Sequence, residues 1–135
     1  IAKDYIKDNT DLIIENGGDI FIKTSKERHI LIHAGDSQLS DQISIKITPE
    51  MTPIGVCTSS GKLGHSLSFG KADAVVVVAK DILYADAAAT AICNIIKTPR
   101  DIERGLGIAK ESKKIEGIVI ILDDSIGIWG NIVLI

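Results

Sequence analysis

Alternating apolar and polar residues predict a series of short strands in the first half of the chain. Apolar stretches at residues 12–15 and 20–23 flank an Asn-Gly-Gly-Asp turn, a pattern that predicts a hairpin whose glycines supply positive backbone angles. Further strands are predicted at residues 28–33, 42–48 and 54–57, and the second of these alternates as a strand with one solvated face does. Residues 74–79 are the most apolar run, which predicts a central strand.

A helical pattern follows, with strands on both sides of it. Asp81 stands at the N-cap position of a helix predicted to end near Ile96. Thr98 as N-cap and Pro99 at the first helical position predict a second helix that ends near residue 113. Two strands at residues 118–122 and 126–134 complete the chain, whereas residues 1–9 have the loose period of a helix end. This order predicts an α+β fold with two helices and a largely antiparallel sheet.

Composition places the chain among folded, single-domain proteins. It has 135 residues, of which 45% are hydrophobic and 24% charged, with a formal net charge of -3. An acidic balance without a polybasic tract argues against nucleic acid or a membrane surface as partner, and no apolar run is long enough to span a bilayer. Cys57 and Cys93 fit no metal-ligand spacing, so we interpret them as reduced core thiols of a cytoplasmic protein.

The most informative residues are Asp86 and Thr90, which lie four residues apart in a run of small side chains. At this spacing a carboxylate and a hydroxyl lie on one helix face, where they offer two hard oxygen ligands to a magnesium or calcium ion. A purely structural interpretation stays open. Asp86 is also favoured near a helix N-terminus, and Thr90 is able to bond back to a carbonyl one turn earlier.

Residues 58–70 are rich in glycine and serine, and they admit several interpretations. Backbone amides and hydroxyls at Thr58, Ser59, Ser60 and Gly61 are suited to cup an anion, but an ordinary serine-glycine loop has the same composition. A phosphate-loop motif is rejected because five residues, rather than four, separate Gly55 from Gly61, and Leu63 replaces the required serine or threonine.

The remaining candidate groups carry weaker signals. His65 near Ser59, Ser60 and Ser66 suggests a hydrolase, but neither a nucleophile elbow nor an orienting acid accompanies it. His29 and His33 are interpreted as surface residues of a strand rather than as metal ligands. Gly17 and Gly18 serve a tight turn, and they also permit a ligand to approach the backbone closely.

Taken in order, the double-glycine turn, the Thr58 to Gly61 loop and the Asp86/Thr90 helix resemble the ApbE-like family of FAD:protein FMN transferases. The resemblance runs from about Leu12 to the C-terminus, and the segment 57–80 is most similar to an uncharacterised, non-lipoprotein branch. It implies a T-fold-like architecture and FAD as cofactor, with transfer of FMN to a threonine of an acceptor protein. It further implies that Asp86 and Thr90 bind Mg²⁺ and that the following residues contact the flavin: Gly17, Gly18, Thr58, Ser59, Ser60 and Gly61.

The sequence also departs from the transferase pattern. After the serine-glycine loop, the segment that begins at His65, the candidate catalytic residue, is shorter than in the transferases and lacks their proline. The chain matches only the C-terminal part of a typical member, so we interpret residues 1–135 as a single ApbE-like domain of a longer protein. A homo-oligomer or a partner chain is then expected to complete the nucleotide site. The alternative function is a non-catalytic ligand-binding or assembly module of the same fold.

Overall fold

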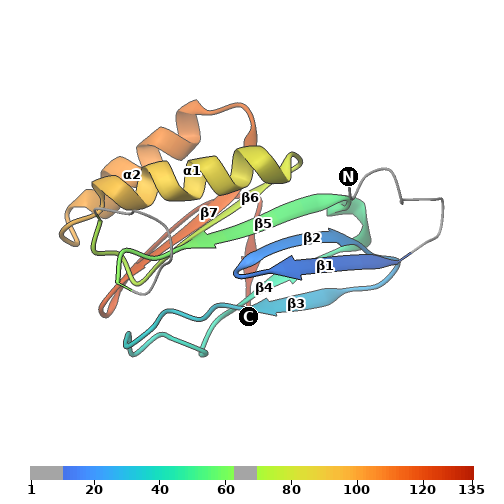
Figure 1. Ribbon diagram of the computed structural model, residues 1–135, viewed down its shortest axis with the longest axis horizontal. Coiled ribbons are helices and arrows are strands. Elements are labelled where there is room, and N and C mark those ends of the chain that lie inside the picture. Colours follow the sequence, from blue (N-terminus) through green and yellow to red (C-terminus); the bar gives the residue numbers. More distant parts are fainter. Residues whose placement is uncertain (1–10, 63–69) are drawn as a thin grey trace.

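The protein is built in three layers, with a six-stranded sheet between two helices on one face and a three-stranded sheet on the other (Figure 1). This computed structural model describes residues 11–62 and 70–135. The large sheet has the order β1-β2-β5-β6-β7-β8, the small one β3-β4-β9, and all of their pairings are antiparallel. The predicted α+β class with two helices is confirmed.

The elements have the following bounds: β1 Leu12–Asn16, β2 Asp19–Lys23, β3 Arg28–Leu31, β4 Ser44–Ile47, a 3-10 turn at Pro49–Met51, β5 Ile54–Ser59, β6 Ala74–Ala79, α1 Ile82–Ile95, α2 Asp101–Glu111, β7 Ile115–Leu122, β8 Ser125–Gly130 and β9 Val133–Leu134. The predicted hairpin at the start of the chain is β1 and β2. The predicted helix capped by Asp81 is α1, whose N-cap carboxylate accepts hydrogen bonds from the amides of Leu83 and Tyr84. The prediction for residues 1–9 concerns a segment outside the described residues.

Two hydrophobic cores lie on opposite faces of the large sheet. Alternate residues of β6 point to opposite faces, so Val75 and Val77 pack under the helices while Val76 and Val78 pack against the small sheet. All six residues of β6 are buried, which confirms the predicted central strand. Both faces of the large sheet are covered, and its central strand β6 accordingly consists of alanine and valine alone.

Small residues allow α1 to pack closely against β5. Ala85 and Ala89 are buried on the face of α1 that meets the sheet. Opposite the first turn of α1, a Cβ atom added to Gly55 would lie 2.7 Å from the Cα of Ile82, so only glycine fits beneath the helix start. From there α1 runs along β5 in the direction of Ser59 (Figure 1).

The prediction for the start of the second helix is wrong by two residues. Arg100, rather than Thr98, is the N-cap residue of α2. The carboxylate of Asp101 accepts hydrogen bonds from the amides of Lys97 and Thr98, both at 2.9 Å. This bonding holds Thr98 and Pro99 in a turn directly before the helix, whose N-cap residue makes no side-chain capping bond.

The C-terminal strand predicted at residues 126–134 is in fact two strands that belong to different sheets. Gly130 ends β8 with a φ of 101°, and the amide of Asn131 donates to the carbonyl of Glu116 at 2.8 Å. The chain turns at this point, and β9 pairs with β4 of the small sheet. The last residues therefore join the two sheets.

Candidate functional site

A cavity of about 520 Å³ lies where the β1–β2 hairpin ends and β5 continues alone along the sheet edge. The amide of Thr58 donates to the carbonyl of Gly18 at 3.0 Å, and beyond this bond Ser59 pairs only with β6. The strand predicted to end at Cys57 is thus two residues longer, because pairing with β6 extends past the hairpin. The lining residues are Glu15, Gly17, Gly18, Asp19, Ile20, Ile30, Leu31, His33, Gly35, Thr58, Ser59, Ser60, Asp73, Asp86 and Thr90.

The cavity brings together the three motifs that the sequence singles out. Members of all three line it, although up to 73 positions separate them in the chain: Gly17, Gly18, Thr58, Ser59, Ser60, Asp86 and Thr90. Gly61 is not among the lining residues, and its amide donates to the carbonyl of Ala72 at 2.9 Å. His65 lies outside the described residues.

Helix α1 forms one wall of the cavity with residues that lie beside its buried face. Asp86 is exposed and Thr90 half-buried, and each follows a buried alanine in the sequence. Eight helical residues from Ile82 to Thr90 rise about 12 Å, and four strand residues from Gly55 to Ser59 rise about 13 Å. The side chain of Thr90 is therefore placed above Ser59, and that of Asp86 above Cys57.

The hairpin turn supplies the opposite corner. Gly17 and Gly18 have φ values of 59° and 101°, the conformation of a two-residue turn that favours glycine. A Cβ added at Gly18 would reach the carbonyl oxygen of Thr58 only at 3.5 Å, an ordinary contact. The turn conformation alone therefore accounts for both glycines, while both also face the cavity.

The end of β5 supplies hydroxyl-bearing residues to the cavity, and two of the four amides in the predicted anion cup bond to the backbone. The amides of Thr58 and Gly61 are both used in backbone hydrogen bonds, so they do not point at a ligand. The side chain of Ser59 is 93% buried, since its exposed fraction is 7%, and its Oγ has no hydrogen-bond partner among the described residues. A buried polar atom of this kind requires an explanation.

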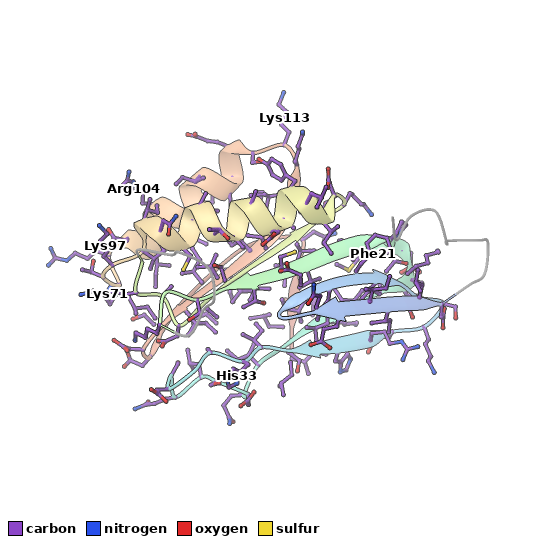
Figure 2. The ribbon with its side chains drawn as sticks, viewed as in Figure 1. Phe21, His33, Lys71, Lys97, Arg104 and Lys113 are labelled. Atoms are coloured by element: carbon purple, nitrogen blue, oxygen red, sulfur yellow. The ribbon has the colours of Figure 1, made fainter. Side chains whose placement is uncertain are left out.

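The cavity is acidic, a property that the sequence motifs did not predict. Four carboxylates line it, those of Glu15, Asp19, Asp73 and Asp86, and no lysine or arginine belongs to the described part of its wall. Of these four, only Asp86 was predicted as a site residue. Labelled basic side chains such as Lys97, Arg104 and Lys113 project outward from the helical layer (Figure 2).

Asp19 and Asp86 interact through their charges at one end of the cavity. Burial raises the pKa of Asp19 above its ordinary value, and the negative charge of Asp86 raises it further. Burial beside the same two carboxylates also raises the pKa of the Cys57 thiol. Cys57 and Cys93 are both buried, as expected of core thiols. The acidic end thus carries two carboxylates that repel one another.

Asp73 marks the other end of the cavity wall. Its carboxylate accepts a hydrogen bond from the amide of Asp123 at 2.7 Å and forms an ion pair with Lys62, whose Nζ lies 3.1 Å from Oδ1. Lys62 is also paired with the carboxylate of Asp123 at 3.2 Å. The position of Asp73 directly before the apolar strand β6 was the one sequence signal for a buried acid, and the prediction missed it.

His29 and His33 lie on the surface, as predicted. His29 pairs with Glu27 at 2.7 Å, and His33 lies 3.4 Å from Asp41. Figure 2 shows His33 on the side of the small sheet, opposite the helices, where it contributes to the cavity wall. This second role of His33 was not predicted.

The donor set fits a magnesium ion that shares its coordination with a ligand. Among residues 11–62 and 70–135, no three His, Cys, Asp or Glu side chains are grouped to enclose a metal ion. Mg²⁺ is commonly held by one or two carboxylates together with substrate phosphates and water, rather than by an all-protein cage. The carboxylates of Asp19 and Asp86 with the hydroxyl of Thr90 match that pattern, and a cation would relieve the repulsion between the two acids.

The three layers define an α+β protein with an acidic cavity at the end of its first hairpin. A family model described as AbpE bacteria matches residues 1–124, so the chain belongs to this ApbE-related family. No helix in the described residues is long and apolar enough to cross a membrane.

Archaeal relatives carry the name UPF0280 protein. The chain is 44% identical to one from Methanocaldococcus jannaschii over 127 residues, which cover 90% of this chain and 52% of the relative. It is 40% identical to one from Methanoregula boonei over 121 residues, which cover 89% of this chain and 50% of the relative. It is 38% identical to one from Methanobrevibacter smithii over 138 residues, which cover 98% of this chain and 58% of the relative. The chain thus spans about half the length of these relatives.

Proposed function

We propose that this chain binds a flavin nucleotide, FAD, together with Mg²⁺, in the cavity between α1 and the β1–β2 hairpin. The observation that carries the proposal is an acidic cavity that unites the three motifs of the ApbE-like resemblance. A volume of about 520 Å³ is within the range of small-molecule sites, and the lining also includes the apolar side chains of Ile20, Ile30 and Leu31.

Charge explains why the nucleotide and the metal depend on each other. A pyrophosphate would be repelled by Asp19 and Asp86 because no lysine or arginine in the described wall offsets them. When bound, Mg²⁺ supplies positive charge that neutralises the pyrophosphate. Asp86 and Thr90 hold it from the helix, Asp19 from the hairpin, and the hydroxyls of the β5 end contact the nucleotide. We expect negligible affinity for FAD without the metal.

Transfer of FMN to a protein threonine is the further activity that the family resemblance suggests. The candidate catalytic residue, His65, is outside the described residues. The acceptor protein, and the chain segment that completes the site in a homo-oligomer or from a partner, are proposed on the same resemblance. A non-catalytic binding module is the alternative, because all the contacts inferred here serve binding.

One incubation separates these functions. The protein is mixed with FAD in the presence or absence of Mg²⁺, desalted, and assayed for retained flavin and released AMP. We expect flavin to be retained only with Mg²⁺. AMP release would indicate transfer or hydrolysis, retention without AMP would indicate a binding module, and absence of flavin under both conditions would contradict the proposed function.

A further inference from the structure

The cavity reaches both faces of the large sheet at the end of the β1–β2 hairpin. Asp19 is paired in register with Cys57 of the core under the helices, and it interacts with the charge of Asp86. The next residue, Ile20, packs instead in the core on the side of the small sheet, as Ile30 of β3 does. Both isoleucines line the cavity. One side of the cavity therefore holds the proposed metal ligands near α1, and the other side lies against β3.

Two hydrogen bonds of Ile32 determine which backbone groups face the cavity from β3. The amide of Ile32 donates to the carbonyl of Ile43 at 2.9 Å, and its carbonyl accepts from the amide of Asp41 at 2.9 Å. Both peptide bonds of Ile32 are trans, so in each of them the C=O and the N–H point in opposite directions. The carbonyl of Leu31 and the amide of His33 therefore point away from β4, to the free edge of β3.

The register of the small sheet agrees with this orientation. Leu31 is opposite Ser44, whose amide and carbonyl both bond to Ile135 on the far side of β4, at 3.0 and 2.9 Å. β3 is an edge strand, and Leu31 and His33 both line the cavity. Among the described residues, no backbone hydrogen bond pairs the carbonyl of Leu31 or the amide of His33. This strand edge thus offers an acceptor and a donor side by side to a ligand in the cavity.

We infer that the free edge of β3 recognises the heterocyclic ring of the bound nucleotide. The carbonyl of Leu31 accepts from an N–H of the ring, and the amide of His33 donates to the acceptor atom beside it. Both rings of FAD carry such an edge, the imide of the flavin and the amino edge of adenine. Ring sites are commonly apolar with a few backbone polar groups, and Ile20, Ile30 and Leu31 supply the apolar part. The inference rests on the proposed function and specifies the ring-binding side of its cavity.

Charge and spacing place the phosphates on the other side of the cavity. Glu15 is paired with Ile20 and shares its face of the sheet, so its carboxylate disfavours a phosphate beside β3. Asp86 and Thr90, which would hold the metal ion, belong to the helix side. Stacked sheets lie about 10 Å apart, so the edge of β3 is about that far from the plane of the hairpin. The sugar of a nucleotide separates the ring edge from the phosphates on the same length scale.

Proline at position 33 removes one of the two recognition groups and no hydrogen bond of the small sheet. Proline lacks the N–H, and it is tolerated on an edge strand where that N–H faces outward. His33→Ala is the reference, because it removes the same imidazole and keeps the amide. The affinity of His33→Pro for FAD with Mg²⁺ should be about 2- to 10-fold below that of His33→Ala, the value of one neutral hydrogen bond.

His29→Pro and His29→Ala are the matched controls. His29 lies on the same strand two residues before Leu31, so its amide points to the same edge, but it does not line the cavity. Both His29 variants should bind FAD as the wild type does. Equal losses of affinity in His29→Pro and His33→Pro would contradict the inference, since proline would then act by distorting β3.

Amide NMR of the wild type tests the same hydrogen bond without a substitution. Binding of FAD with Mg²⁺ should slow hydrogen exchange of the His33 amide and leave that of His29 unchanged. FMN and ADP, each with Mg²⁺, identify the ring, because slowing by FMN alone indicates the flavin imide and slowing by ADP alone indicates adenine.

Two results would overturn this inference and leave the proposed function in place. One is an unchanged His33 amide in the FAD-bound protein, and the other is equal affinity of His33→Pro and His33→Ala for FAD. A wild-type protein that fails to bind FAD with Mg²⁺ would instead contradict the proposed function.

Discussion

Replacing Gly55 by alanine tests how closely α1 is seated on β5. The added Cβ would lie 2.7 Å from both the Cα and the Cβ of Ile82, whereas carbon atoms in contact are normally about 3.5 to 4.0 Å apart. The start of α1 must therefore move by about 1 Å, because a backbone atom cannot rotate away. Overpacking of this kind costs about 1–3 kcal/mol.

Thermal unfolding followed by circular dichroism measures this cost. For a chain of this length, 1 kcal/mol corresponds to about 4 °C in the unfolding midpoint, so Gly55→Ala should lower it by about 4–12 °C. Because α1 carries Asp86 and Thr90, a displaced helix should also weaken Mg²⁺-dependent binding of FAD.

Gly107→Ala is the control for this prediction. A Cβ added at Gly107, inside α2, meets no atom within 4 Å. Alanine is the better helix former by about 0.5–1 kcal/mol, so this variant should be more stable than the wild type. A midpoint of Gly55→Ala equal to or above the wild-type value would show that α1 does not contact β5 as described.

Three further predictions concern acidic residues and thiols of the chain. The raised pKa of Asp19 means that the folded state holds its proton more tightly than the unfolded chain, so this carboxyl lowers stability as pH rises from its ordinary value of 3.8 through the folded pKa. Asp86→Asn should lower that pKa, measured by carbon NMR titration, and raise the midpoint above this pH window; an unchanged pKa would contradict the interaction. Asp81→Ala removes the N-cap of α1 and should cost about 0.5–2 kcal/mol in urea unfolding. Cys57 and Cys93 should react with a thiol reagent only after unfolding, since both are buried, and rapid labelling of the native protein would refute this.

Local signals in the sequence were sufficient for much of the fold. The double glycine determines the hairpin, Asp81 determines the start of α1, and the valine run determines β6, because each acts within a few residues of itself. The predictions were wrong where hydrogen bonds to residues outside the local pattern set the boundary of a helix or strand. The carboxylate of Asp101 bonds back to the amide of Lys97 and delays the start of α2. The turn at Gly130, where the amide of Asn131 bonds the carbonyl of Glu116, separates β8 from β9.

The candidate site was predictable in part for the same reason. The residue types of the Asp86/Thr90 pair and of the loop after Cys57 indicated hard-oxygen chemistry, and the structure places them in one cavity. These residues come together because β5 extends past the end of the β1–β2 hairpin. That extension results from pairing with β6, which no local sequence pattern predicts. Asp19 and Asp73 were missed because their significance is burial and charge in the fold.

Metal-dependent binding is tested most directly by calorimetric titration of FAD into the protein with and without Mg²⁺, repeated with Asp86→Ala. We expect binding that requires the metal in the wild type and is strongly weakened in the variant, because an acidic cavity without lysine or arginine in its described wall accepts a pyrophosphate only through a cation. Equal affinity with and without Mg²⁺, or an Asp86→Ala variant that binds as tightly as the wild type, would contradict it.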